Sequence, residues 1–427
     1  MRNKKYYPAV SRDEMNKILD FEGLSIDLYK KFIDRNYQEN KLLSLKALLP
    51  LTNLDQEFQG RINEYPAVSH HVWLTNMDKP RDILTYVSDE FKHNKYNPNK
   101  VTGGIDDIDN TFIGSIKNLD KGAQESKLPI SDDHFHHILW TNYSREDLIQ
   151  HPELTNLRKI CNIDEGQIEL PEFIVININD VMNNEISEIR NQAKLDIPLP
   201  NIVISGLSQM KYDLLSVDTA LEKMFNEKKF ASMSDVVRLA AVKNLGGIYF
   251  DVDYNFFDQL KLHDNKQYHM FDLMKHYNSI IGKESNTLQS TRLCNSIISA
   301  GQPNSKVITS MWDIVERNII SQDPLYYIKY PKNDFHKVIC ETGPIATTVG
   351  FLRAEEEYDI ALDFGALYYN NFKRPSHELK LKGDVGPIGY DTWGGSWLEC
   401  KYKQYKSYLY YDEDGRGITE AEWEAMF

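Results

Sequence analysis

The sequence has few cysteines, no long apolar run and no excess of basic residues. Its four cysteines lie far apart and form no CxxC pair: Cys161, Cys294, Cys340 and Cys400. We therefore expect reduced thiols and no disulfide framework. No stretch reaches the roughly 18–20 continuous apolar residues of a membrane span, so membrane association has no support in the sequence. Residues 1–15 are basic but contain no apolar core, so we expect no Sec-type signal peptide there.

Several classes of protein are excluded by what else is missing. The net charge of −14 argues against a nucleic-acid binder, because phosphate contacts need a basic surface. There is no GxSxG, P-loop or GxGxxG motif, so hydrolase, NTPase and dinucleotide-binding hypotheses lack support. Histidines gather at 70–71 and 134–137, but no partner pattern for a tetrahedral zinc site follows them.

Apolar periodicity predicts alternating strands and helices. Residues 11–65 have helical spacing, and the first three strands are expected at Ala67–Asn76, His134–Asn142 and Glu172–Asp180. A helix is expected over residues 144–161, between the second and third strands. This alternation is typical of an α/β sheet with helices on its faces.

The same pattern suggests a division of the chain. We expect an N-terminal helical subdomain over residues 1–65, one α/β domain over residues 66–400, and a tail with a short helix over residues 401–427. The α/β domain is expected to contain a polar, Gly/Asn-rich insertion at about 93–130 and a mostly helical one at about 181–230.

The most informative stretch is GGIYFDVDYNFF, which begins at Gly246. Period-two alternation places Tyr249, Asp251 and Asp253 on one side of the strand, away from its other apolar residues. The two aspartates are then about 7 Å apart, since each residue of a strand rises ~3.3 Å. Such a pair at the carboxyl end of a strand suits a divalent cation, although the D-x-D pattern alone is common in polar turns.

The preceding helix adds a second signal. Ser232 and Asp235 have capping-box spacing at its start, and Gly246 and Gly247 end it. Arg238 lies three residues after Asp235, on the same helical face. Taken alone, these residues indicate either a capped helix with an exposed arginine or a charged site next to the D-x-D strand.

The whole run SDVVRLAAVKNLGGIYFDVD, residues 234–253, is far more specific than D-x-D. It resembles the sugar-nucleotide-binding segment of DXD-type GT-A glycosyltransferases, in particular the glucosyltransferase domains of large clostridial cytotoxins and related bacterial effector glucosyltransferases. Short anchors from residue 68 to residue 397 extend the resemblance. It implies a GT-A fold, in which helices flank a Rossmann-like mixed sheet.

The resemblance also implies roles in binding the donor. In SHHVWLTN, the residues Val72, Trp73 and Leu74 match the strand whose tryptophan stacks on uracil; such stacking contributes roughly 1–3 kcal/mol. Asp235 and Arg238 match a pair that contacts the donor sugar. Tyr249 lies along the donor, and Asn295 is a candidate contact near the anomeric carbon. The motif ETGPIATTV, residues 341–349, matches a turn on the acceptor side with a structural role.

The metal site follows from the same resemblance. Asp251 contacts ribose and sugar and reaches Mn²⁺ or Mg²⁺ through water, whereas Asp253 binds the metal directly. Near the C-terminus, YDTWGGSWL contains Ser396 and Trp397, which match a loop that closes over the diphosphate. There the serine region helps to ligate the metal and the indole N–H donates to the leaving phosphate. Asp391 is the candidate for an additional acidic ligand.

The function implied is retaining, metal-dependent transfer of a sugar from a UDP-sugar to a hydroxyl of a protein acceptor. UDP-glucose is the first candidate donor and UDP-GlcNAc the second, because the small neighbours of Asn295 leave room for an acetamido group. Catalysis would depend on Asp235, Arg238, Asp251, Asp253, Asn295 and Trp397. The expected partner is a host protein, reached by a monomeric effector that is secreted into host cytoplasm by a non-Sec route; without such export the chain would be cytoplasmic.

Two alternatives from other classes remain. The chain could be a non-catalytic module that binds a UDP-sugar, or a metal-dependent phosphodiesterase that uses the carboxylates. The non-catalytic module would bind a UDP-sugar in the same pocket but would not transfer the sugar. The second needs further His or Asp ligands at strand ends, which the sequence does not supply.

Overall fold

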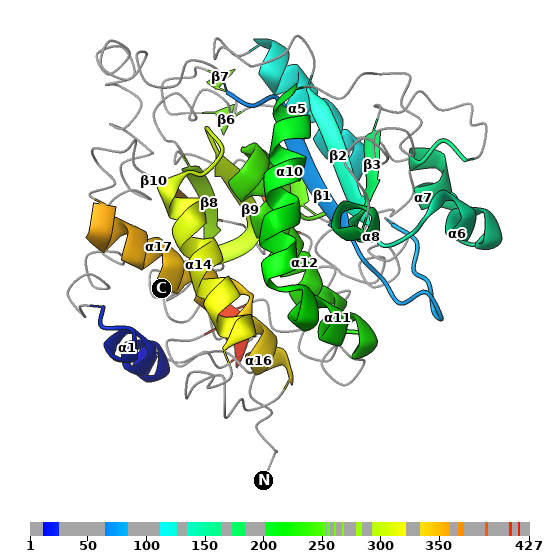
Figure 1. The fold of residues 1–427 in the computed structure, drawn as a ribbon. Helices are drawn as coiled ribbons and strands as arrows, with labels where there is room; N and C mark the ends of the chain where they lie inside the picture. The colour runs from blue at the N-terminus through cyan, green and yellow to red at the C-terminus, as the bar shows by residue number, and fades with distance from the viewer. Residues whose placement is uncertain are drawn as a thin grey trace.

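A computed structural model describes residues 12–24, 65–83, 112–125, 135–163, 173–183, 201–252, 254–256, 260–261, 267–268, 279–283, 293–321, 334–358, 366–370, 389–391, 410–411 and 417–418. The helices and strands are arranged as a central sheet with helices on both faces (Figure 1). No helix among these residues is long and apolar enough to cross a membrane.

The central sheet has seven strands in the order β10-β8-β9-β4-β1-β2-β3. Their bounds are β1 Val68–Trp73, β2 His136–Thr141, β3 Phe173–Asn177, β4 Gly247–Phe250, β8 Ser279–Lys283, β9 Leu293–Ala300 and β10 Ala366–Asn370. Strands β1 to β4 pair in parallel, whereas β9 is antiparallel to both β4 and β8, and β10 is parallel to β8. The expected mixed α/β sheet is therefore confirmed.

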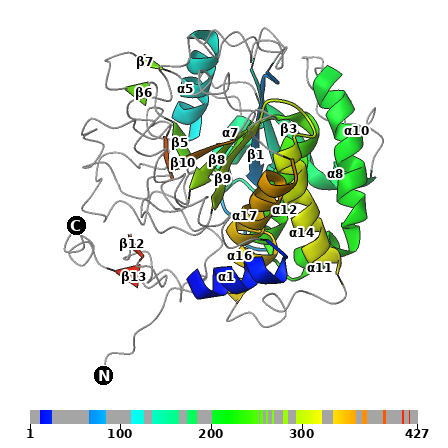
Figure 2. The ribbon, with the colours of Figure 1, turned by 90° about the vertical axis from the view of Figure 1, so that its left-hand side faces the viewer.

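One face of the sheet is covered by helices that share a large apolar core. They are α8 Ile178–Asn183, α10 Asn201–Ser216, α11 Asp218–Asn226, α12 Phe230–Leu245, α14 Lys306–Ile320, α16 Asp334–Glu341 and α17 Pro344–Tyr358. In Figure 2, α12, α14 and α17 lie together beside the strands. Helix α12 is buried almost all round because it lies between the sheet, α10 and α14. The expected helical character of residues 181–230 is confirmed for the described part.

The opposite face has a second, aromatic-rich core under α5 Phe112–Glu125, α6 Arg145–Gln150 and α7 Thr155–Ile160. Helix α5 lies inside the 93–130 excursion, which the sequence analysis treated as polar, and its buried face includes Phe112, Ile113 and Ile116. Period-two alternation in β4 is confirmed, because Ile248 and Phe250 face this core while Tyr249 faces the other.

Short two-stranded pairs complete the described elements. Strand β5 Tyr254–Phe256 pairs with β11 Gly389–Asp391, β6 Leu260–Lys261 with β7 Gln267–Tyr268, and β12 Tyr410–Tyr411 with β13 Gly417–Ile418.

Two element boundaries differ from the sequence prediction. The third strand ends at Asn177, and residues 178–180 begin helix α8. The helix expected over residues 144–161 is two short helices, α6 and α7, separated around Pro152. Proline has no N–H to donate to the helical hydrogen-bond pattern, which explains the interruption.

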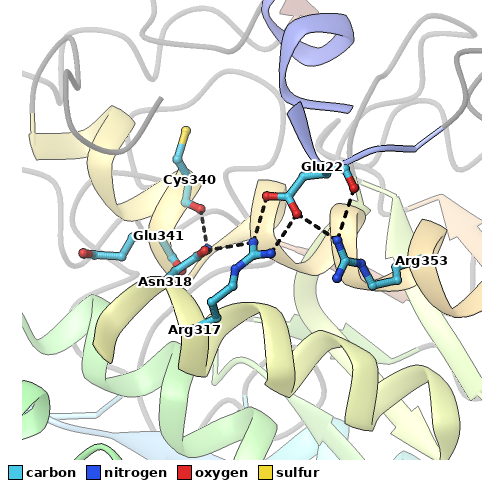
Figure 3. Close-up of polar contacts among 6 residues, drawn as sticks. All are labelled: Glu22, Arg317, Asn318, Cys340, Glu341 and Arg353. Atoms are coloured by element: carbon cyan, nitrogen blue, oxygen red, sulfur yellow. Dashed lines mark hydrogen bonds and ion pairs between the residues drawn. The ribbon is translucent and has the colours of Figure 1, made fainter. Parts of the chain in front are cut away.

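The N-terminal helix α1 Arg12–Phe21 packs on the α14–α17 side of the molecule. Its Met15, Ile18 and Leu19 belong to the same apolar core as those helices. Just after α1, the buried Glu22 carboxylate binds Arg317 of α14 at 2.8 Å and Arg353 of α17 at 3.0 Å (Figure 3). This arrangement fixes the end of α1 to two helices that are far away in the sequence.

Candidate active site

The candidate site lies where β4 ends. Helix α12 ends at Gly246, and Gly246 and Gly247 have φ of 69° and 79°, a region that favours glycine. A Cβ on Gly247 would lie 2.2 Å from the Val68 carbonyl oxygen of β1, so only glycine fits there. The chain can therefore turn directly from α12 into β4, which confirms the predicted helix end.

Arg238 of α12 lies at the centre of the site. Its NH1 donates to the Asn295 carbonyl at 2.7 Å and lies 3.3 Å from Asp251 Oδ1, and its NH2 lies 3.3 Å from Asp235 Oδ1. The guanidinium carbon is 4.6 Å from the centre of the Tyr249 ring. The side chain is 9% exposed, so the alternative of an exposed arginine does not hold, and Arg238 lies inside a cluster of charged side chains next to β4.

Asp235 holds several elements together. Its Oδ1 accepts from Asn295 Nδ2 of β9 at 2.8 Å, and its Oδ2 accepts from Thr342 Oγ1 at 2.9 Å. The expected capping box is wrong: α12 begins at Phe230, one turn earlier, so Ser232 and Asp235 lie inside the helix. Because Asp235 caps no backbone N–H groups, its carboxylate faces the site instead.

Burial dominates the electrostatics. It raises the pKa of Asp235 from 3.8 to about 6, even though Arg238 acts in the opposite direction. The pKa of Asp251 is also raised by desolvation, against the attraction of Arg238 and a hydrogen bond from Tyr249. Burial raises the pKa of Tyr249 as well. The site therefore holds two carboxylates that share one guanidinium, with little solvent to screen them.

Asp251 is the most exposed of these groups, with 28% of its side chain accessible. Both its contact with Arg238 and its contact with Tyr249 use Oδ1. Among the described residues, none forms a hydrogen bond or ion pair with its Oδ2. A partly exposed carboxylate oxygen without a protein donor is the type of ligand that hard divalent cations prefer.

At the end of β1, the side chain of Trp73 is largely buried in the core on the α5 face of the sheet, whereas Val72 and Leu74 belong to the core on the opposite face. Its indole N–H donates to the Arg81 carbonyl at 3.0 Å. The next residue, Asp82, accepts hydrogen bonds from the first N–H groups of α7, at 2.8 and 2.9 Å. The loop after β1 is thus attached to α7 and determines the orientation of the indole ring.

Two polar side chains, those of Asn142 and Thr342, make structural contacts that the sequence pattern does not predict. Asn142, after β2, exchanges two hydrogen bonds with the Thr75 backbone, at 3.0 and 2.9 Å, and so joins the loops after β1 and β2. The repeated Thr-Asn pair at the ends of both strands was the available signal. Thr342 was placed in a structural turn, and its bond to Asp235 depends on packing between distant segments.

Four candidates cannot be placed fully. Asp253, Ser396 and Trp397 lie outside the described residues, as does the side chain of Asp391. The backbone of Asp391 is described and pairs with Tyr254, the residue directly after Asp253. Within the described parts of the chain, no group of three or more His, Cys, Asp or Glu side chains could hold a metal ion.

The mixed sheet, with an arginine–carboxylate cluster at the end of its central strand, is the arrangement expected for a GT-A glycosyltransferase. More particularly, residues 82–255 match the family model of the TcdA/TcdB catalytic glycosyltransferase domain. The match includes α12, β4 and both aspartates of D-x-D, and it confirms the resemblance to clostridial toxin domains. No curated protein matches the chain.

Solved structures of low identity are also similar. "PaToxG Glycosyltransferase" is 16% identical, with a TM-score of 0.37 over 74% of this chain and 82% of that one. The UDP-bound glycosyltransferase domain of the YGT toxin is 10% identical, with a TM-score of 0.33 over 72% of this chain and 80% of that one. The ligand-free form of the YGT domain is also 10% identical, with a TM-score of 0.35 over 85% of this chain and 88% of that one.

Proposed function

We propose that the chain transfers a hexose from a UDP-sugar to a hydroxyl of a protein acceptor, with retention of anomeric configuration and with Mn²⁺ or Mg²⁺. Glucose is the first candidate sugar and GlcNAc the second. The observation that carries the proposal is the cluster around Arg238, which joins Asp235, Asp251 and Asn295 from three elements at the carboxyl end of β4. In open α/β sheets, ligands bind beyond this end of the strands.

In this proposal Asp235, Arg238 and Asn295 hold the donor sugar. A carboxylate accepts hydrogen bonds from sugar hydroxyls, and a guanidinium donates to hydroxyls or balances phosphate charge. The bonds among these three side chains fix their positions before the donor arrives, so little reorganisation is needed during reaction. Trp73, with Val72 and Leu74, would support the uracil ring, and Tyr249 would lie along the donor.

The donor set fits a divalent metal. Asp251 offers the carboxylate oxygen that no described residue engages, and Asp253 follows two residues later. The pairing of Asp391 with Tyr254 brings the C-terminal candidate close to the D-x-D segment along the backbone, which supports its inclusion. Asp251, Asp253, Asp391 and Ser396 would hold the ion. When bound, a metal neutralises the charge that develops on the departing diphosphate.

The C-terminal loop and the acceptor complete the proposal. Ser396 and Trp397 would close over the diphosphate, with Gly394 and Gly395 as hinges. The acceptor would be a host protein, met by a monomeric effector delivered to host cytoplasm by a non-Sec route. The helical subdomain at 1–65 and the insertions at about 93–130 and 181–230 would shape acceptor recognition, and residues 401–427 would form a tail.

The test is release of UDP from UDP-glucose and UDP-GlcNAc with Mn²⁺, Mg²⁺ or EDTA. We expect metal-dependent release, lost in Asp251→Asn and Asp253→Asn. Glu222→Gln, which removes a carboxylate from the exposed side of α11, is the matched control and should keep wild-type activity. Metal-independent release, or full activity in the double aspartate variant, would refute the proposal. Labelled donor in a host lysate would then show whether a protein is modified.

A further inference from the structure

A line of polar side chains is buried under β1, on the α5 side of the sheet. Ser69 and His71 lie on β1, His137 lies on β2 directly across from Ser69 in the parallel register, and Asp120 lies on α5. Ser69, His71 and His137 are at most 2% exposed. None of these side chains belongs to the candidate active site.

The four side chains form a continuous series of close contacts that ends on the backbone of β4. Asp120 Oδ1 lies 3.0 Å from His137 Nε2, and His137 Nδ1 lies 2.7 Å from Ser69 Oγ. Ser69 Oγ lies 2.9 Å from His71 Nε2, and His71 Nδ1 lies 3.4 Å from the Phe250 carbonyl oxygen. Phe250 is the last residue of β4 and directly precedes Asp251.

Aromatic rings isolate this series from solvent. His71 makes edge contacts with Phe112 and Phe250, with ring centres 4.7 and 4.4 Å apart, and both histidines are near Phe173. The exception is Asp120, whose side chain is 30% exposed. A proton therefore enters or leaves the series through Asp120.

The number of hydrogen bonds in the series can be compared with the number of N–H and O–H protons that its side chains carry. Both ends of the series, a carboxylate and a backbone carbonyl, only accept hydrogen bonds. Four contacts need four protons, but two neutral imidazoles and one hydroxyl supply three. One more proton satisfies every contact: His137 donates from both nitrogens, Ser69 accepts from it and donates to His71 Nε2, and His71 Nδ1–H donates to Phe250.

The extra proton is placed by the surrounding charges. Burial, followed by His137 and His70, lowers the pKa of His71 well below its usual range, so His71 stays neutral. His137 faces the Asp120 carboxylate from α5, whereas the other charged residues of α5 near it, Lys117 and Lys121, are exposed. His70 faces the opposite side of the sheet, where it contacts the Gly246 carbonyl.

We propose that Asp120, His137, Ser69 and His71 form a positioning chain that holds one proton more than its neutral side chains would and thereby fixes the Phe250 carbonyl at the end of β4. When that proton leaves and His137 keeps its Nε2–H on the Asp120 carboxylate, Ser69 donates to His137 Nδ1 and accepts from His71 Nε2–H, so His71 Nδ1 has no N–H for Phe250. The end of β4, and with it Asp251, then loses a buried hydrogen bond. The consequence for sugar transfer rests on the proposed function, whereas the proton count does not.

The first experiment counts ring protons by ¹⁵N NMR of the metal-free, full-length protein at about pH 7. We expect one imidazole with both nitrogens protonated in the wild type. Asp120→Asn removes the carboxylate that His137 Nε2 contacts, so the signal of the doubly protonated ring should be lost. Glu125→Gln, which removes an exposed carboxylate from the same helix, is the matched control and should leave the signal unchanged.

A second variant and a kinetic measurement keep the test decisive. Ser69→Ala keeps both histidines but separates them, so the doubly protonated ring should remain while the His71 signals change. The pH profile of UDP release should fall at lower pH in Asp120→Asn than in Glu125→Gln. Wild-type rings that are all singly protonated, or identical profiles for the two α5 variants, would overturn the proposal. If the wild type releases no UDP, the proposed function fails, and the NMR count still decides the proton chain.

Discussion

Asp235→Asn is expected to make the folded protein more stable at neutral pH while lowering its activity. In the folded protein, burial raises the pKa of Asp235 to about 6 from its ordinary 3.8. The ionised carboxylate is therefore less stable in the fold than in the unfolded chain, although Arg238 attracts it. A residue that costs stability in its charged form is typical of a functional site.

The magnitude follows from the difference between the two pKa values. Two units correspond to about 3 kcal/mol, since each unit is worth about 1.36 kcal/mol. The folded state binds this proton more tightly than the unfolded state, so the free energy of unfolding falls as the pH rises from about 4 to about 6 and then levels off. An asparagine does not titrate, so its advantage over wild type should grow across that window, towards a value on the order of 3 kcal/mol.

The hydrogen bonds do not reverse this expectation. The asparagine oxygen can accept from Asn295, and its amide can donate to Thr342, whose hydroxyl rotates to accept. Arg238 keeps Asp251 and the Asn295 carbonyl, so it is not left as an unpaired buried charge. Asp235→Ala, in contrast, removes both acceptors and should destabilise the fold by about 1–3 kcal/mol.

The assay is denaturant unfolding of the metal-free protein at several pH values between about 4 and 8. The activity of Asp235→Asn is measured separately, as UDP release. An asparagine variant that is less stable than wild type at pH 8 would refute the reasoning. So would a stability difference that stays constant between pH 4 and pH 8, because the titration of Asp235 would then not be the cause.

Three further outcomes are expected. Gly247→Ala should destabilise the fold by about 3 kcal/mol or more in thermal unfolding, because its Cβ would meet a β1 carbonyl at 2.2 Å. Gly23→Ala shares the positive φ but has open space, so an equal loss in both variants would contradict the steric argument. Glu22→Gln should lower the free energy of unfolding by about 1–3 kcal/mol, because it breaks ion pairs to two arginines that are about a third exposed. The KM for the donor should stay unchanged, and an altered KM would connect α1 to the site. Trp73→Ala should weaken UDP binding in calorimetry by about 1–3 kcal/mol, with Trp73→Phe close to wild type; equal affinity in all three proteins would exclude stacking on this ring.

Much of the fold was predictable because its signals are local. The strands that become β1, β2 and β3 were located to within a few residues, and the glycine pair correctly marked the end of α12. The alternation in β4 placed Tyr249 and Asp251 on one side, where a hydrogen bond joins them. Each of these features depends on residues close together in the chain.

Errors arose where a local pattern competed with packing. The spacing of Ser232 and Asp235 suited a capping box, but burial of Phe230 and its neighbours against α11 and the core extended α12 by a turn. The excursion at 93–130 looked polar overall, yet the apolar side of α5 has a place on the sheet. The average composition of the segment is polar, but the apolar residues on one face of α5 are enough to pack it against the sheet.

Periodicity and backbone sterics operate over a few residues, so the amino-acid sequence is enough to predict an α/β chain, the order of its strands and a glycine-limited turn that leads into two aspartates. Long-range packing is needed to bury Arg238, to bring Asn295 and Thr342 to Asp235, and to connect Asp120 through two histidines to β4. These contacts join residues up to 179 positions apart, and their geometry exists only after the sheet and its helices have packed.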